Sequence, residues 1–191
     1  MAASAAYRKF LAWRKANDVD NIRALVETRP FEVPTTSEFV PDFLPFDFRT
    51  KGQPENPSEN IGAIILLSIG KWRTSELTSL IKRGELSLSD FSVYWIFIFE
   101  SLHKCLYSES VKQKQMVFVE AISDLKGFSL RQITPAFVSL VLRPWISELQ
   151  ANYPETAKRI NVVHLPKVVS LLWKAVNPMI SPGTAAKIRI R

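Results

Sequence analysis

The segment VFVEAISDLKGFS, residues 117–129, carries the strongest indication of the fold. An apolar run at residues 116–122 is closed by turn-forming residues at 123–127, where Asp124 and Gly127 stand. A short apolar run bounded by a turn indicates a buried β-strand rather than a surface helix. We therefore predict one strand of an internal sheet here.

Further strands and helices alternate on both sides of this segment. Strands are expected at residues 63–69, 160–165 and 186–190, and helices at residues 74–83, 91–107, 134–150 and 167–177. The second of these helices follows a start signal at residues 87–90, and Pro144 interrupts the third. Alternating strands and helices predict an α/β fold with a mainly parallel sheet and helices packed around it.

The first sixty residues have a different character. Two short helical stretches, at residues 7–16 and 19–26, are stopped by Pro30. Residues 31–60 contain several prolines and are expected to form an irregular connection with one short strand at most.

Composition limits the class of protein. The 191 residues are 47% hydrophobic, and the apolar runs are about half of the ~20 residues that a membrane-spanning helix needs. The start of the chain lacks the basic-then-apolar order of a secretory signal, and the single Cys105 has no partner within the chain. We therefore expect a cytoplasmic protein.

The net charge of +7 is concentrated near the C-terminus, where residues 143–191 hold eight Lys or Arg against two Glu. Such a basic, apolar-rich region suits nucleic-acid phosphates or anionic lipid headgroups. We expect no nucleic-acid partner, because Trp and Phe stand in apolar runs rather than between arginines as stacking platforms.

Enzyme signatures are missing from the sequence. It has no glycine-rich phosphate loop, no nucleophile elbow and no Cys/His cluster with metal-ligand spacing. Structural roles are the preferred interpretation for His103 and His164. We predict no enzyme activity, no catalytic residue, no metal and no cofactor.

Three stretches in order carry a family resemblance. The first is residues 117–129, an apolar strand followed by Asp-x-x-Gly-x-Ser. The second is NYPETAKRINVVHLP at residues 152–166, and the third is LWKAVNPMISPGTAAKI at residues 172–188. Together they resemble the CRAL-TRIO lipid-binding domain family, which includes phosphatidylinositol-transfer, tocopherol-transfer and retinaldehyde-binding proteins.

This resemblance implies a division of the chain. Residues 1–30 would be a remnant of the family's N-terminal helical region, which residues 10–22 resemble. Residues 31–191 would be a CRAL-TRIO-like lipid-binding domain whose C-terminal part is missing. The expected fold is thus a CRAL-TRIO-like α/β domain, incomplete at the C-terminus.

The resemblance also implies a pocket for a lipid or isoprenoid ligand. Residues 168–180 are apolar over more than one stripe, which from the residues alone favours a buried core helix. With the resemblance, this segment becomes the family's gate helix, which covers the pocket. The pocket floor and gate are expected to comprise Ile64, Leu66, Val117, Val119, Ile160, Val162, Val169, Leu172, Trp173 and Val176.

The expected function is binding of a single hydrophobic or amphiphilic ligand and its transfer or presentation at membranes. Docking to an anionic membrane surface would be peripheral and transient, and would use the indole and basic residues near the gate, Lys167, Trp173, Lys174 and Lys187. A second hypothesis is a degenerate CRAL-TRIO module that binds a protein partner as a scaffold, without lipid.

Overall fold

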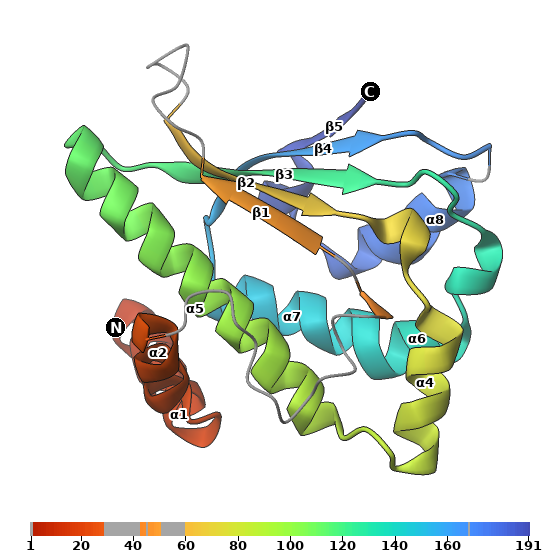
Figure 1. Ribbon diagram of the computed structural model, residues 1–191, viewed down its shortest axis with the longest axis horizontal. Helices are drawn as coiled ribbons and strands as arrows, with labels where there is room; N and C mark the ends of the chain where they lie inside the picture. The colour runs from red at the N-terminus through yellow and green to blue at the C-terminus, as the bar shows by residue number, and fades with distance from the viewer. Residues whose placement is uncertain (1, 29–42, 45, 51–59, 168) are drawn as a thin grey trace.

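A five-stranded sheet forms the centre of the computed structural model, which describes residues 2–28, 43–44, 46–50, 60–167 and 169–191 (Figure 1). Its strands lie in sequence order and are β1 (Phe46–Thr50), β2 (Ile61–Leu67), β3 (Phe118–Asp124), β4 (Ala157–Val163) and β5 (Ile188–Ile190). The first strand is antiparallel to β2, and all later neighbours are parallel. The predicted α/β fold with a mainly parallel sheet is confirmed.

The helices precede the sheet or connect its strands. They are α1 (Ala2–Ala16), α2 (Val19–Thr28), α4 (Thr74–Arg83), α5 (Leu88–Gln113), α6 (Pro135–Phe137), the π-helical η5 (Val138–Leu142), α7 (Arg143–Asn152), α8 (Val169–Val176) and α9 (Pro182–Ala185). Single 3₁₀ turns occur at η3 (Ile69–Lys71), η4 (Leu130–Gln132) and η6 (Asn177–Met179).

The connecting helices gather on one face of the sheet. Strands β2 to β5 are parallel and consecutive, so right-handed crossovers that all advance in one direction place every connection on the same side. Figure 1 shows α4, α5, α6 and α7 together below the strands. A space between this helical layer and the sheet is therefore bounded by residues from many parts of the chain.

Helix α5 is the structural centre of the molecule. Ser87 caps its first turn through a reciprocal capping box with Asp90, which satisfies otherwise unpaired backbone donors. Along its 26 residues it contributes to three buried apolar clusters, one with α4, α6 and α7, one with the sheet, and one with α2. The N-terminal helices and the sheet are thus packed on the same helix.

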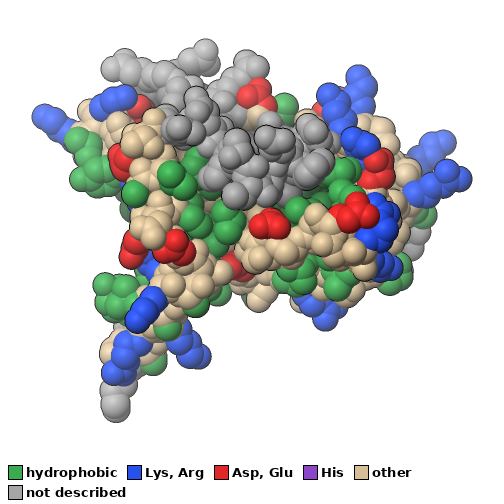
Figure 2. All heavy atoms as spheres, turned by 60° about the horizontal axis from the view of Figure 1, so that its bottom comes forward, with side chains coloured by type: hydrophobic (Ala, Val, Ile, Leu, Met, Phe, Trp, Pro, Cys, Tyr) green, Lys and Arg blue, Asp and Glu red, His purple; other side chains and the backbone are tan. Residues whose placement is uncertain are grey.

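Helix α1 contacts the body of the protein through its last turns. Trp13 donates its indole N–H to Glu148 of α7, and its ring lies 5.7 Å from that of Tyr153. Figure 2 shows the other end of α1 projecting from the body with Lys and Arg side chains around it. Tyr7 and Leu11 of α1 are exposed.

Two local features bring the elements around the sheet together. The π-helical turn η5 precedes Pro144, which has no N–H to donate to the carbonyl of Leu140. At the carboxyl end of β2, a Cβ on Gly70 would lie 1.9 Å from the carbonyl oxygen of Lys126. Only glycine therefore allows the turn after β3 to pack this closely on the chain after β2.

Some predicted boundaries shift. The helix at residues 74–83 is found with those bounds, whereas the helix predicted to end at residue 107 continues to Gln113. The third predicted strand begins at Ala157 instead of residue 160, and α9 was not predicted. Within the proline-rich connection, β1 is the described strand, and residues 29–42, 45 and 51–59 lie outside the described part of the chain.

Candidate functional site

A cavity of about 440 Å³ lies between the sheet and helices α5, α7 and α8. We call it the pocket. Its lining is mostly aliphatic and aromatic, and the helical side chains that line it include Trp95, Phe99, Leu102, Trp145, Ile146, Leu149, Trp173 and Val176.

Two rows of side chains across four strands form the pocket floor. One row, in register from β2 to β5, is Ile65, Ala121, Ile160 and Ile188; the next is Leu67, Ser123, Val162 and Ile190. Side chains alternate between the two faces of a strand, so residues two apart share the pocket face. The floor is therefore continuous from β2 to the edge strand β5.

The structure places part of the predicted floor in the lining. Val119, Ile160 and Val162 line the pocket, whereas Ile64 and Leu66 alternate with lining residues and belong to the opposite face of β2. Their places on the pocket face are taken by Ile65 and Leu67.

The remaining predicted pocket residues have different positions. Val117 is buried in the cluster that α5 forms with the sheet, outside the lining. Trp173 and Val176 line the pocket from α8. Val169 and Leu172 belong to the backbone of α8, but their side chains lie outside what the structure describes.

Three tryptophans form one wall of the pocket. The ring of Trp145 lies 4.6 Å from Trp95 and 6.1 Å from Trp72, measured between centroids, and all three residues line the pocket. Among the described residues, no hydrogen-bond acceptor is found for their buried indole N–H groups. This wall presents aromatic surface, and sequence reasoning missed it because the three residues come from separate segments without a common motif.

Polar side chains line another part of the pocket, at the turn after α7 and the start of β5. Lys187 pairs with Glu155 at 2.6 Å. Glu155 has a φ of 58°, a left-handed conformation that is uncommon for residues other than glycine. The side chain of Gln150 donates to the carbonyl of Met179 at 2.8 Å and accepts from the backbone N–H of Ser181. We call Tyr153, Pro154, Glu155, Thr156 and Lys187 the polar rim.

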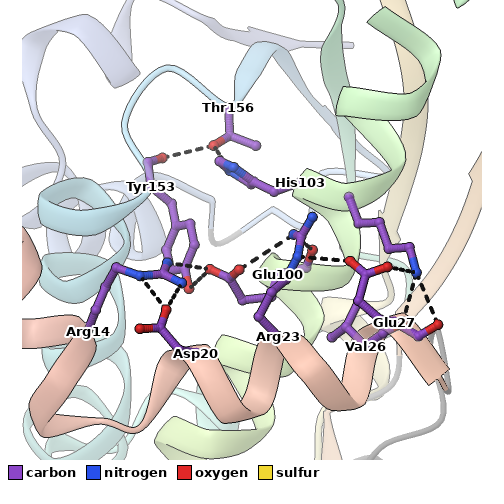
Figure 3. A network of polar contacts seen from close by, with 10 residues as sticks. Arg14, Asp20, Arg23, Val26, Glu27, Glu100, His103, Tyr153 and Thr156 are labelled. Carbon is purple, nitrogen blue, oxygen red and sulfur yellow. Dashed lines mark hydrogen bonds and ion pairs between the residues drawn. The ribbon is translucent and has the colours of Figure 1, made fainter. Parts of the chain in front are cut away.

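Burial keeps Tyr153 of the rim and the neighbouring His103 uncharged. It raises the pKa of the Tyr153 hydroxyl, and the nearby negative charge of Glu100 raises that pKa further. Burial also lowers the pKa of His103, whose Nε2 lies 3.0 Å from the hydroxyl oxygen of Thr156 (Figure 3). At neutral pH these two rings therefore act as neutral hydrogen-bonding groups.

The family model for the CRAL/TRIO domain matches residues 62–191, which include the pocket floor, the tryptophan wall and the polar rim. The chain belongs to the CRAL/TRIO family. The resemblance predicted from the sequence is confirmed.

Individual relatives match shorter parts of the CRAL/TRIO chain. A CRAL-TRIO domain-containing protein of Caenorhabditis elegans is 35% identical over 69 residues, which are 36% of this chain and 10% of that protein. The protein real-time of Anopheles gambiae is 38% identical over 64 residues, which are 34% of this chain and 9% of that protein. The matches thus span about a tenth of these curated relatives.

The crystal structure of Sfh5 has the same fold. Its TM-score is 0.70 at 16% identity, and the match covers 99% of this chain and 60% of that chain. This similarity extends to α1 and α2, which lie before the residues that the family model matches.

The residues predicted to meet a membrane have two locations, on and before α8 and at the start of β5. Lys167 and Lys174 are exposed, and Trp173 is 37% exposed while it also lines the pocket. Trp173 thus stands at the boundary between pocket and solvent. Lys187 has a different place, in the polar rim, where it is paired with Glu155.

Within the described residues, no helix is long and apolar enough to cross a bilayer. The same residues hold no cluster of three His, Cys, Asp or Glu side chains arranged to bind a metal ion.

Proposed function

We propose that this CRAL/TRIO protein binds one hydrophobic or amphiphilic lipid-like molecule in the pocket and transfers or presents it at membranes. The observation that carries the proposal is the apolar pocket between sheet and helices. Its volume of about 440 Å³ falls within the ~300–1,000 Å³ typical of sites for a single small ligand.

The two kinds of lining suit the two ends of an amphiphile. Aliphatic floor residues and the tryptophan wall can cover an apolar chain or ring, and each buried CH₂ contributes about 0.8 kcal/mol. In the polar rim, the ammonium of Lys187 and the carboxylate of Glu155 can contact a headgroup. The proposed role is binding without chemistry.

Release requires a path out of the pocket, and we propose that α8 is the gate. Trp173 and Val176 of this helix line the pocket, and its Lys174 is exposed to solvent. Movement of this short helix at an anionic membrane would open the pocket to the bilayer. This mechanism suits a cytoplasmic protein that associates peripherally and reversibly with membranes.

Occupancy of the pocket can be tested directly. The purified protein is extracted with organic solvent, and the delipidated protein is incubated with mixed phospholipids and isoprenoids and analysed by native mass spectrometry. We expect one lipid per chain. A protein that stays at its ligand-free mass would contradict the proposal and favour the scaffold hypothesis.

A pair of variants on one strand makes this test specific to the pocket. Ala121→Phe fills the centre of the floor, and Ile122→Phe adds an aromatic ring on the opposite face of β3. We expect Ala121→Phe to lose most lipid while Ile122→Phe keeps it, with circular dichroism unchanged in both. Equal lipid loading of the two variants would place the ligand elsewhere.

A further inference from the structure

Glu100 is a buried residue of α5, and its carboxylate lies between arginines of α1 and α2 on one side and Tyr153 on the other (Figure 3). The residue is 5% exposed. Arg14 of α1 approaches its Oε1 at 3.3 Å, and Arg23 of α2 approaches its Oε2 at 3.5 Å and donates to its backbone carbonyl at 2.8 Å. On the other side, the hydroxyl of Tyr153 donates to Oε1 at 3.0 Å.

Tyr153 belongs to the pocket as well as to this network. It lines the pocket beside Phe99, and the two ring centroids lie 5.2 Å apart. It also begins the polar rim, where Thr156 donates its hydroxyl to the carbonyl of Tyr153 at 3.0 Å.

His103, one helical turn after Glu100 on α5, binds the same Thr156 hydroxyl at 3.0 Å. The conformation of the polar rim therefore depends on two neighbouring side chains of α5. Of these, Glu100 is also held by α1 and α2.

We propose that Glu100 is a positioning residue for the pocket, which couples the docking of α1 and α2 to ligand binding by holding Arg14 and Arg23 on one side and Tyr153 on the other. The inference rests on the proposed function and adds a role for helices that do not line the pocket. It makes the N-terminal helix pair part of the ligand site without contact to the ligand.

The physical basis is the cost of a buried charge. If α1 and α2 leave, Glu100 loses both guanidinium groups, and its carboxylate must draw water to the surface of α5 beside Tyr153. The tyrosine hydroxyl then loses a fixed acceptor, and the rim that it begins is no longer held in place. By thermodynamic linkage, a ligand bound against the ordered rim must in turn favour docked α1 and α2.

The test deletes single polar groups and measures hydrogen exchange of the α2 amides, residues 19–28. Tyr153→Phe removes only the hydroxyl, and Glu100→Gln removes the charge. Tyr107→Phe is the matched control, because Tyr107 lies on α5 but is 71% exposed. We expect the α2 amides to exchange about tenfold faster in the first two variants and at the wild-type rate in the control. Exchange in β3 should be unchanged in all three variants.

The ligand arm uses geranylgeraniol and, separately, vesicles of palmitoyl-oleoyl phosphatidylcholine as probes. Loading the wild type with either probe should slow α2 exchange severalfold, and Tyr153→Phe should lose this response and release the probe faster. Arg23→Ala and Tyr153→Phe should combine less than additively, because both act through Glu100. A merely structural role for Tyr153 would not make α2 respond to a ligand in the pocket.

The outcomes separate the coupling from the function. A loaded wild type whose α2 exchange is unchanged overturns the coupling, even though lipid binding stands. If the wild type binds neither probe, the proposed function fails with these lipids. The comparison of ligand-free Tyr153→Phe with the ligand-free wild type then tests the link between α2 and the rim. Faster α2 exchange in the variant supports this link, and exchange at the wild-type rate overturns it.

Discussion

His103 is a partly buried histidine whose charge state affects stability. Burial is the main cause of its lowered pKa; the positive charges of Arg23 and Arg14 lower the pKa further, and Glu100 opposes them. In the unfolded chain the imidazole returns to its ordinary value near 6.5. Below that pH the unfolded state binds more protons than the folded state.

The predicted consequence is a loss of stability on acidification. The contribution of His103 is complete above about pH 6.5 and declines as the pH falls toward the lower folded-state pKa, by roughly 1.4 kcal/mol for each unit of difference. Urea unfolding at pH 7.5 and pH 5.5 measures it. His103→Gln should show a smaller difference between the two pH values than the wild type, and an equal difference would contradict the assignment.

Individual floor residues could be predicted only where a strand carries polar markers. In β3 and β4, Arg159 and Asn161 both donate to Glu120 on the face away from the pocket. The residues that alternate with them, Val119, Ile160 and Val162, must therefore point inward. The run in β2 has no such marker, because every residue from 63 to 67 is apolar. The predicted floor residues Ile64 and Leu66 therefore belong to the face away from the pocket. Ile65 is identified as a floor residue only by its pairing in the sheet with Ala121.

Gln150 ties α7 to the segment that follows the proposed gate. Its side chain bonds to backbone groups of Met179 and Ser181, and these bonds hold the chain directly after α8 and η6. The sequence could not assign this role to Gln150, because its partners are backbone atoms about thirty residues away.

We predict that Gln150→Ala loosens the gate. Loss of hydrogen bonds worth about 0.5–1.5 kcal/mol each should speed lipid exchange about threefold to tenfold while changing overall stability little. Transfer of a labelled lipid between donor and acceptor vesicles measures the rate. Gln115→Ala, an amide near the end of α5, is the control, and equal rates in the two variants would exclude Gln150 as a latch.

At the scale of elements, the sequence predicted what local signals encode. The capping residues Ser87 and Asp90 define the start of α5, and the apolar runs define β2 and β3. The short α9, capped by Ser181, was missed because four residues do not show a helical period. The pocket itself depends on how the layers pack, which no local pattern specifies.

At the scale of the molecule, the predicted membrane docking would combine charge and apolar surface. Lys167 and Lys174 are exposed, and Lys174 follows Trp173 in the chain. Each lysine near an anionic surface contributes about 1 kcal/mol. An indole at the interface adds a second favourable contribution. Neither is large, so the predicted association is weak, reversible and sensitive to salt.

Vesicle flotation tests this prediction. Trp173→Ala and Lys174→Glu should each reduce binding to phosphatidylserine-containing vesicles at low salt by about threefold to tenfold, with an unchanged circular-dichroism spectrum. Tyr107→Ala removes an exposed aromatic ring outside the gate and should bind as the wild type. Wild-type binding by both gate variants would favour a core helix at residues 168–180.

The division of the chain at residue 30 stays a prediction. The packing of α2 on α5 bears on how separate the first region is. Val19, Ile22 and Val26 of α2 are buried against Ile96 and Phe97 of α5. The helices expected to be a separate region thus share a core cluster with the central helix of the domain.

The tryptophan wall gives the protein an optical property. Of its five tryptophans, Trp72, Trp95, Trp145 and Trp173 line the pocket, and Trp13 packs on Tyr153 at the rim. Intrinsic fluorescence therefore comes almost entirely from rings that a ligand would touch, and the 4.6 Å spacing of Trp95 and Trp145 favours exciton coupling in the near ultraviolet. A conjugated ligand would accept their excitation energy, so filling and emptying of the cavity could be followed in real time without any added label.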